Sequence, residues 1–373
     1  MKFLIVTHVP HLVEQDQYFG YAPYVREMNI WLKYTDEVTI VAPVSKSATS
    51  PIDLSYQHHQ IDFKKVPNFN FISINHSLLS MLKLPILFWK IVWAMKQADH
   101  IHLRCPGNMG FLGCIIQILF PFKTKTAKYA GNWDPKSKQP WTYRLQKWIL
   151  RNTFLTRNMQ VLVYGNWKNQ SKNIKPFFTA TYSETEKTVI PKTIHPNTKI
   201  KFIFAGSLVE GKKPMYAIQL LEQLQKTNKN MVLDLYGEGT LRTSLEKYID
   251  SNNLKEYVFL HGNQNQEVLK KAYQQSHFVI LPSKSEGWPK AIAEGMFWGC
   301  VPLATSVSCV ADMLDKGNRG VLLQMDLDKD AAKIHELMNN QIDFEIKSKA
   351  ALNWSRNYTL ERFDNEIQKL LQE

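Results

Sequence analysis

The sequence has few cysteines, and none stands in a metal-binding pattern. Cys105, Cys114, Cys300 and Cys309 form no C-x-x-C pair in a chain of 373 residues. Such usage is typical of reduced thiols in a cytosolic protein. We find no Asp-x-Asp or His/Asp cluster at the end of an expected strand, so we expect neither a zinc site nor any other metal.

A signal peptide and an uninterrupted membrane span are also lacking. The N-terminal MKFLIVTHVP is too short for a signal peptide and predicts a first buried strand. The longest apolar run, residues 77–95, is interrupted by Lys83, Pro85 and Lys90. We expect a loop or short helix, then a helix from Pro85 that is apolar nearly all round. Burial in the N-terminal domain and contact with lipid both explain that pattern.

Acidic residues are scarce in the first half of the chain. Residues 1–190 contain 23 Lys and Arg against 11 Asp and Glu, whereas residues 191–373 contain 23 against 22. Nearly all of the net charge of +13 therefore lies in the first half. This asymmetry indicates an anionic partner, either a lipid surface or a diphosphate-linked acceptor. No RRM, KH, zinc-finger or helix-turn-helix pattern is present, so we expect no nucleic-acid partner.

The remaining pattern alternates strand-like runs with helical segments, which is typical of an α/β protein with two domains. In the first half we expect strands at 3–7, 38–42, 98–103, 126–130 and 161–164, and a polar loop at 9–24. Residues 183–197 are polar and contain two prolines, so they are the best linker. The alternation restarts at residue 201. An amphipathic segment, 359–373, ends the chain.

The most informative stretch is FVILPSKSEGWPKAIAEGMFWGCVPL, residues 278–303. It predicts a buried strand, a polar loop, a helix that begins at Pro289 and ends at Gly299, and a second strand from Val301. The first amides of such a helix form a phosphate site. Glu286 and Glu294 flank this site, where carboxylates are suited to accept hydrogen bonds from sugar hydroxyls. The local pattern therefore indicates a site for a nucleotide linked to a sugar.

The E-x7-E spacing of Glu286 and Glu294, each followed by a glycine, resembles the motif of retaining GT-B glycosyltransferases, especially family 4. The resemblance implies two doubly wound Rossmann-like domains that face a cleft. It implies an acceptor domain at 1–185, with 358–373 crossing back to it, and a nucleotide-sugar donor domain at 186–357. Glu286 would face the transferred sugar and Glu294 would bind the ribose hydroxyls.

Other segments resemble the same family. The segment after the strand at 201–205 resembles the one in which an arginine and a lysine hold the donor diphosphate. Lys212 matches the lysine, whereas Ser207 replaces the arginine. Asp134 follows the strand at 126–130, near the place of a catalytic group in related enzymes, although a turn-forming role before Pro135 is the simpler explanation. We predict Glu286, Lys212 and Asp134 as catalytic, and a donor-binding set of Gly206, Ser207, Lys212, Gly237, Gly262, Asn263, Glu286, Gly287, Trp288, Pro289, Lys290, Ala291 and Glu294.

The expected activity is that of a metal-independent, retaining hexosyltransferase. It would move a sugar from a nucleotide-diphosphate donor, which is a substrate rather than a cofactor, to a glycan or lipid-linked acceptor in bacterial surface polysaccharide or glycolipid synthesis. A sugar-nucleotide epimerase and a non-catalytic sugar-nucleotide-binding subunit are the alternatives. We expect a cytoplasmic location, and peripheral attachment to the inner membrane face is a further hypothesis.

Overall fold

The computed structural model describes residues 1–67, 74–195, 198–227 and 230–372, apart from the side chains of 74–83. The chain divides into two compact units, Met1–Phe178 with Asp364–Glu373, and Thr179–Phe363. The sequence-based division has its junction after residue 185 and its returning segment from residue 358. Among the described residues, no helix has the length and apolar character needed to cross a bilayer.

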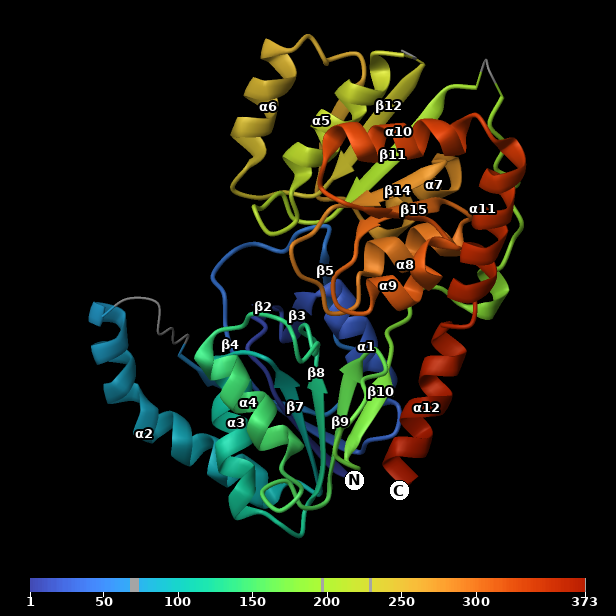
Figure 1. Cartoon of the computed structure of the whole chain (residues 1–373). Coiled ribbons are helices and arrows are strands. Elements are labelled where there is room, and N and C mark those ends of the chain that lie inside the picture. The colour runs from blue at the N-terminus through green and yellow to red at the C-terminus, as the bar shows by residue number, and fades with distance from the viewer. Residues whose placement is uncertain (68–73, 196–197, 228–229, 373) are drawn as a thin grey trace. The chain divides into compact units, whose positions relative to one another are not determined.

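The N-terminal unit is built on a seven-stranded sheet in the order β10-β9-β8-β7-β1-β4-β6 (Figure 1). Every neighbouring pair is parallel, so all carboxyl ends lie at one edge. The central strands are apolar because both faces of the sheet are covered. The strands are β1 (Lys2–Val6), β4 (Glu37–Pro43), β6 (Ile61–Val66), β7 (His100–Cys105), β8 (Thr124–Tyr129), β9 (Met159–Tyr164) and β10 (Ile174–Phe177).

The helices of this unit bury one face each. They are α1 (Ala22–Leu32), α2 (Ile74–Gln97), α3 (Asn108–Ile116), α4 (Trp141–Arg151) and residues 364–372 of α12 (Leu360–Gln372). Asp364 of α12 accepts hydrogen bonds from Lys33 Nζ at 2.7 Å and Tyr34 Oη at 2.6 Å. Ile367 and Leu370, two residues of the expected apolar stripe, are buried.

Two expectations for this unit are wrong. Residues 9–24 are not a loop but contain β2 (Leu12–Glu14) and β3 (Gln17–Tyr21), which pair antiparallel with each other, and β3 pairs with β5 (Asp53–Ser55). These strands are short and mostly half-buried or exposed, so no apolar run in the sequence predicts them. Helix α2 runs through Pro85 without a break and forfeits one backbone hydrogen bond there. Its apolar character is also divided, with Ile91 buried and Trp89 exposed.

The C-terminal unit repeats the doubly wound plan with a six-stranded parallel sheet in the order β13-β12-β11-β14-β15-β16. Its strands are β11 (Ile200–Ala205), β12 (Met231–Tyr236), β13 (Val258–Gly262), β14 (Phe278–Leu281), β15 (Val301–Thr305) and β16 (Val321–Leu323). Its helices are α5 (Pro214–Gln225), α6 (Arg242–Ser251), α7 (Gln266–Gln275), α8 (Lys290–Phe297), α9 (Val310–Met313), α10 (Leu327–Met338) and α11 (Gln341–Ser355). The predicted α/β class with two Rossmann-like halves is confirmed.

The expected strand-loop-helix unit at 278–303 is present, with one shift of boundary. Pro289 is the N-cap of α8 rather than its first residue, and Gly299 follows the C-cap with φ at +79°. Gly295 lies where α8 packs on β14, since a Cβ there would come 2.6 Å from Val279 Cγ1. The glycine after Glu294 therefore permits close helix–strand packing and sets the position of α8 over the sheet.

Candidate active site

The candidate site of the C-terminal unit lies at the carboxyl edge of its sheet. Four loops meet there, because β11, β12, β13 and β14 are parallel and adjacent. In open parallel sheets this edge is where ligands bind. The loops after β11 and β14 carry the two predicted catalytic groups of this unit, Lys212 and Glu286.

Lys212 and Glu286 form an ion pair, although 74 residues separate them. The distance from Lys212 Nζ to Glu286 Oε1 is 2.5 Å. The Glu286 side chain is 7% exposed and that of Lys212 is 30% exposed. A backbone hydrogen bond of 2.8 Å from Lys284 N to Gly211 O joins the same two loops. The structure therefore brings these predicted residues together and gives the buried carboxylate a cationic partner.

Two glycines at this edge pack loop against loop. Gly237 has φ at +140°, and a Cβ there would come 2.1 Å from Gly206 O. A Cβ at Gly239 would come 2.4 Å from Leu208 O. Gly237 was predicted to approach the donor, and the group that it approaches here is the protein backbone. By contrast, nothing lies within 4 Å of a Cβ at Gly211.

The loop before α8 is held from two sides. Gly287 O accepts hydrogen bonds from Ser308 Oγ at 3.4 Å and from Cys309 Sγ at 3.2 Å. Burial raises the pKa of the Cys309 thiol to about 12, so this thiol stays protonated as a donor. Trp288 stacks on Trp354 with ring centroids 5.9 Å apart. This loop is consequently fixed where it would meet a ligand.

The first turn of α8 is closed by its N-cap. Pro289 O accepts from Ile292 N at 3.0 Å and from Ala293 N at 3.2 Å. Pro289 is buried, while Lys290 and Ala291 are half-buried. The predicted phosphate cradle thus has a regular helical start, and both half-buried residues belong to the predicted donor-binding set.

Glu294 has a different set of partners from Glu286. Thr181 Oγ1 donates to Glu294 Oε1 at 2.8 Å. Burial raises the pKa values of Tyr182 and Tyr273 well above the usual range, and the Glu294 charge adds to both shifts. Glu294 and Lys290 also line a small cavity of about 20 Å³. The two glutamates of the E-x7-E pattern are therefore in distinct environments, and their separate roles stay a prediction.

The other predicted donor-binding residues lie in neighbouring loops of this edge. Ser207 is exposed directly after β11, and Gly206 is half-buried beside it. Gly262 has φ at +69°, and its carbonyl accepts from Gly237 N at 2.8 Å. Asn263, which follows, is half-buried.

Asp134 belongs to the N-terminal unit and lies in a tight turn. Its Oδ1 accepts from Lys136 N at 2.8 Å, and its own amide donates to Asn132 Oδ1 at 2.9 Å. Ser137 Oγ donates to Asp134 O at 2.6 Å. These bonds suit the turn-forming explanation, and the catalytic role stays a prediction.

Several polar side chains lie together at the carboxyl edge of the N-terminal sheet, and the sequence pattern did not predict this cluster. Arg104 of β7 lies with Nη1 3.7 Å from Oε2 of Glu27, and its guanidinium lies 5.2 Å from the Tyr24 ring centre. The Glu27 side chain is only 4% exposed. His8 follows β1, and a Cβ at Gly107 would come 2.7 Å from its Nδ1. The available signal for Arg104 was a cation directly after the expected strand at 98–103, and for Glu27 it was a carboxylate among apolar residues of a helix.

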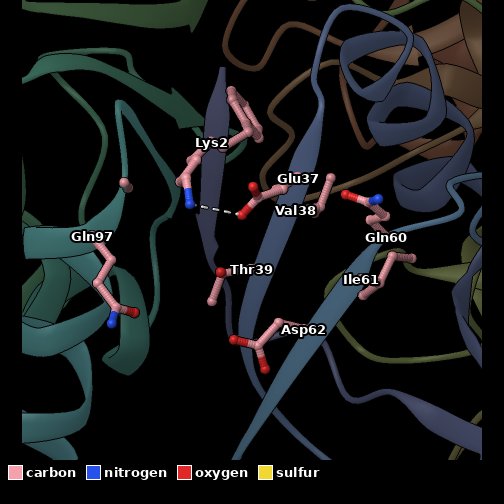
Figure 2. Close-up of a pocket in the computed structure, with 10 residues that line it drawn as sticks. Lys2, Glu37, Val38, Thr39, Gln60, Ile61, Asp62 and Gln97 are labelled. Carbon is pink, nitrogen blue, oxygen red and sulfur yellow. Dashed lines mark ion pairs between the residues drawn. The ribbon is translucent and has the colours of Figure 1, made fainter.

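The cavity shown in Figure 2 is at the opposite end of the same sheet. It measures about 530 Å³ and is lined by the first residues of β1, β4 and β6. Lys2 and Glu37, 3.0 Å apart, neutralise each other at its wall (Figure 2). Because parallel sheets bind ligands at their carboxyl edge, this cavity is a poor active-site candidate.

Metal binding would require a cluster of His, Cys, Asp or Glu side chains. Within the described residues, no group of three or more His, Cys, Asp or Glu side chains is placed to hold an ion. The sequence does contain an Asp-x-Asp pattern three residues after β16. There Asp326 caps α10 by accepting from Lys329 N at 3.2 Å, and Asp328 accepts from Gln223 Nε2 at 2.6 Å. Asp330, two residues further on, accepts from Tyr216 Oη at 2.5 Å. These aspartates have structural partners.

The comparisons with known proteins agree with this geometry. Residues 185–357, which include Lys212, Glu286 and Glu294, match the family described as Glycosyl transferases group 1. The two-unit fold is the GT-B fold. It matches the crystal structure of Anabaena HepE in complex with UDP and glucose with a TM-score of 0.73 and 14% identity over 100% of both chains.

Two curated relatives show how far the sequence likeness extends. Protein CapJ of Staphylococcus aureus is 23% identical over 391 aligned residues, which cover 100% of this chain and 95% of CapJ. An uncharacterized glycosyltransferase of Methanocaldococcus jannaschii is 24% identical over 208 residues, or 55% of this chain. That match spans 57% of the archaeal protein.

Proposed function

We propose that this protein is a retaining glycosyltransferase of family 4 that transfers a hexose from a nucleotide-diphosphate sugar to an acceptor hydroxyl. The observation that carries the proposal is the Lys212–Glu286 pair of 2.5 Å at the carboxyl edge of the C-terminal sheet. It combines a cation for a diphosphate with a carboxylate for a sugar. The match to the group 1 family over the residues that build this edge supports the proposal.

The two charged groups have different tasks in the proposed donor complex. Lys212 is 30% exposed, so its ammonium is free to turn from Glu286 to an incoming diphosphate. Negative charge grows on the β-phosphate as the bond to the sugar breaks, and a fixed cation stabilises that charge most at the transition state. Glu286 then accepts a hydrogen bond from a sugar hydroxyl or stabilises positive charge on the ring.

The donor nucleoside is proposed to bind beside this pair. Glu294, which already accepts a hydrogen bond from Thr181, would bind the ribose hydroxyls. The loop at Gly287 and the start of α8 at Lys290 would contact the diphosphate. The HepE structure contains UDP and glucose, so UDP-sugars are the first donors to examine.

The proposed reaction exchanges one bond at the anomeric carbon. The bond from this carbon to the diphosphate oxygen breaks, and its electron pair leaves with the nucleoside diphosphate. The acceptor oxygen bonds to the same face of the sugar, and its proton passes to the released phosphate oxygen. Lys212 supplies the charge stabilisation that a metal ion gives in other transferases, so the reaction is proposed to be metal-independent.

The acceptor is proposed to be a glycan or lipid-linked hydroxyl in bacterial surface polysaccharide or glycolipid synthesis, with the reaction in the cytoplasm. The excess of 12 positive charges in residues 1–190 supports an acceptor that carries phosphate.

The experiment is a donor screen by thermal unfolding, followed by turnover of the stabilising donors. A donor that binds the folded protein raises its unfolding temperature. Release of the nucleoside diphosphate should fall at least tenfold in Glu286→Gln, and product NMR should show the anomeric configuration of the donor. Turnover unchanged in 5 mM EDTA would support metal independence.

Other outcomes would point elsewhere. Conversion of the donor to an epimeric sugar nucleotide without any acceptor would indicate the epimerase. Donor binding without turnover under every acceptor condition would indicate a binding subunit. Normal turnover in both Glu286→Gln and Lys212→Ala would mean that the active site is elsewhere.

A further inference from the structure

Two helices of the N-terminal unit, α2 and α4, carry exposed tryptophans, and α3 lies between them in the chain. Helices α2 and α3 pack side by side, as do α3 and α4, and all three lie on the same side of β7 and β8 (Figure 1). Buried residues from each helix, such as Ile91, Cys114 and Leu150, belong to one core with the strands. The exposed residues of these helices therefore point away from the sheet, toward solvent.

On α2 this outward stripe is apolar and basic. Ile86, Trp89 and Trp93 are 62%, 67% and 56% exposed. They are spaced three and four residues apart and thus lie on one face of the helix. The exposed Lys90 lies beside them, and the Lys96 ammonium lies 5.4 Å from the Trp93 ring centre.

Helix α4 repeats the same combination. Trp141 and Trp148 are 64% and 58% exposed, and the exposed Arg144 and Arg151 alternate with them along one stripe. Its opposite face, with Ile149 and Leu150, is buried. Large exposed apolar groups in a soluble domain mark a surface for interaction when they gather over neighbouring elements.

The segment that contains these helices is strongly basic, although two of its lysines, Lys125 and Lys128, are buried. Residues 74–178 contain 16 Lys and Arg against two Asp and no Glu, a net charge of +14 that exceeds the net charge of the whole chain. Of the two carboxylates, Asp99 accepts a backbone hydrogen bond from Lys2, and Asp134 is held in its turn. A partner of this surface must therefore be anionic as well as apolar.

We propose that the outward stripes of α2 and α4, named here the tryptophan face, lie on an anionic lipid bilayer. Trp side chains are suited to the boundary between headgroups and acyl chains, because the ring is apolar and its N–H is polar. Lys and Arg beside them attract anionic headgroups and extend long apolar stems along the surface. This combination is the one that interfacial amphipathic helices use.

A bilayer fits the tryptophan face better than a protein partner does. The apolar groups are spread over two helices rather than gathered in one pocket, and positive side chains alternate with them throughout. A protein interface depletes charge at its centre, whereas a lipid surface accepts interleaved cations. The proposal is independent of the catalytic activity, and it would place the acceptor unit where a lipid-linked acceptor resides.

The test is flotation of the full chain with vesicles of phosphatidylcholine alone or with 30% phosphatidylglycerol. Binding should require the anionic lipid and weaken steeply between 50 and 500 mM salt. Arg144→Gln/Arg151→Gln should lower the partition coefficient about fivefold for each charge, or roughly 25-fold together. Trp89→Ser/Trp93→Ser should lower it at least tenfold at unchanged charge.

Matched controls change similar residues of the other unit. Ile342 and Ile346 are 73% and 58% exposed, so Ile342→Ser/Ile346→Ser tests the loss of exposed apolar groups elsewhere. Lys247→Gln tests the loss of an exposed cation. Binding should change less than twofold in both controls. All variants should keep the wild-type unfolding temperature and donor-induced stabilisation, which separates this proposal from the proposed function.

Several results would overturn the proposal. Equal losses in the control variants would show that the effect is not local. Binding that depends on the arginines but not on the tryptophans would indicate general attraction to polyanions. A dimer in solution that Trp89→Ser/Trp93→Ser dissociates, without vesicle binding by the wild type, would show that the occupant is a second copy of the chain.

Discussion

Replacing Glu286 by Gln should strengthen the binding of a nucleoside diphosphate while transfer is lost. In the structure Glu286 holds Lys212 at 2.5 Å and cancels its charge. A diphosphate must compete with this carboxylate for the cation. Glutamine keeps the volume of the buried side chain and a hydrogen-bond acceptor, but it removes the negative charge. The ammonium of Lys212 is then available to the phosphate.

The size of the effect follows from the charges at the site. A unit charge about 7 Å from the phosphate contributes about 1–2 kcal/mol at an effective dielectric constant of roughly 20 to 40. Glu286→Gln should thus raise the affinity about 5- to 30-fold. Lys212→Ala removes a charge-assisted hydrogen bond worth about 1.5–3 kcal/mol and should lower the affinity about 10- to 150-fold.

The stability of the two variants should differ as well. Lys212→Ala leaves the Glu286 carboxylate, 7% exposed, without its cation. Breaking a fully buried pair costs about 3–5 kcal/mol, and the 30% exposure of Lys212 reduces this to roughly 1–3 kcal/mol. Glu286→Gln leaves only a half-exposed ammonium that can turn to water, so its unfolding free energy should change by less than about 1 kcal/mol.

The assay is calorimetric titration with UDP, and with other nucleoside diphosphates if UDP does not bind. Glu210→Gln is the matched control, because this carboxylate is 77% exposed and pairs with Lys284 at 3.7 Å in the same pair of loops. Its loss should change the affinity less than threefold. The reasoning would be refuted if Glu286→Gln weakened binding as much as Lys212→Ala does, because Glu286 would then support the diphosphate site rather than oppose it.

Three further outcomes can be measured on the same protein. Glu294→Gln should weaken nucleoside-diphosphate binding by about 1–3 kcal/mol in calorimetry, whereas Thr181→Val, which removes only its 2.8 Å hydrogen bond, should weaken it less. Gly237→Ala should lower the unfolding free energy by more than about 2 kcal/mol, since its Cβ would come 2.1 Å from a carbonyl oxygen. Gly211→Ala is the control, because a Cβ there meets open space, and it should change the unfolding free energy by less than about 0.5 kcal/mol. Burial lowers the pKa of His100 from 6.5 to about 4, so the unfolded chain binds more protons than the folded chain between these pH values. The unfolding temperature should therefore fall as the pH falls from 6.5 to 4. An unfolding temperature that does not change over this range would contradict the effect of burial on His100.

The C-terminal half was the more predictable part of the fold. Strand β14 forms at the apolar run that opens residues 278–303, as predicted, because it lies inside a parallel sheet and is buried on both faces. Strand β10 was missed, since its residues Lys175 and Pro176 interrupt the apolar pattern. The hairpin of β2 and β3 was missed for a related reason, because pairing rather than burial holds it in place.

The separate residues of the candidate site could be predicted from the sequence, but the contact between them could not. The pattern around Glu286 and the loop with Lys212 could be recognised separately, whereas a contact over 74 residues depends on the order of the strands. Glycines were the least reliable signal. Gly237 was predicted to bind the donor, yet its missing Cβ atom makes room for the carbonyl oxygen of Gly206.

The uneven charge of the chain implies that diphosphate binding and lipid binding depend on different electrostatic interactions. Residues 191–373 have a net charge of only +1, so attraction of a diphosphate to the C-terminal unit must come from local groups such as Lys212 and the start of α8. Contacts of this kind are short and partly buried, and salt screens them little. The tryptophan face instead lies in a segment with a net charge of +14, and exposed charges act over distances that salt screens strongly. Donor affinity should therefore change little with ionic strength, because it depends on a single lysine in contact with the ligand. Lipid affinity should fall strongly with ionic strength, because it depends on many exposed charges.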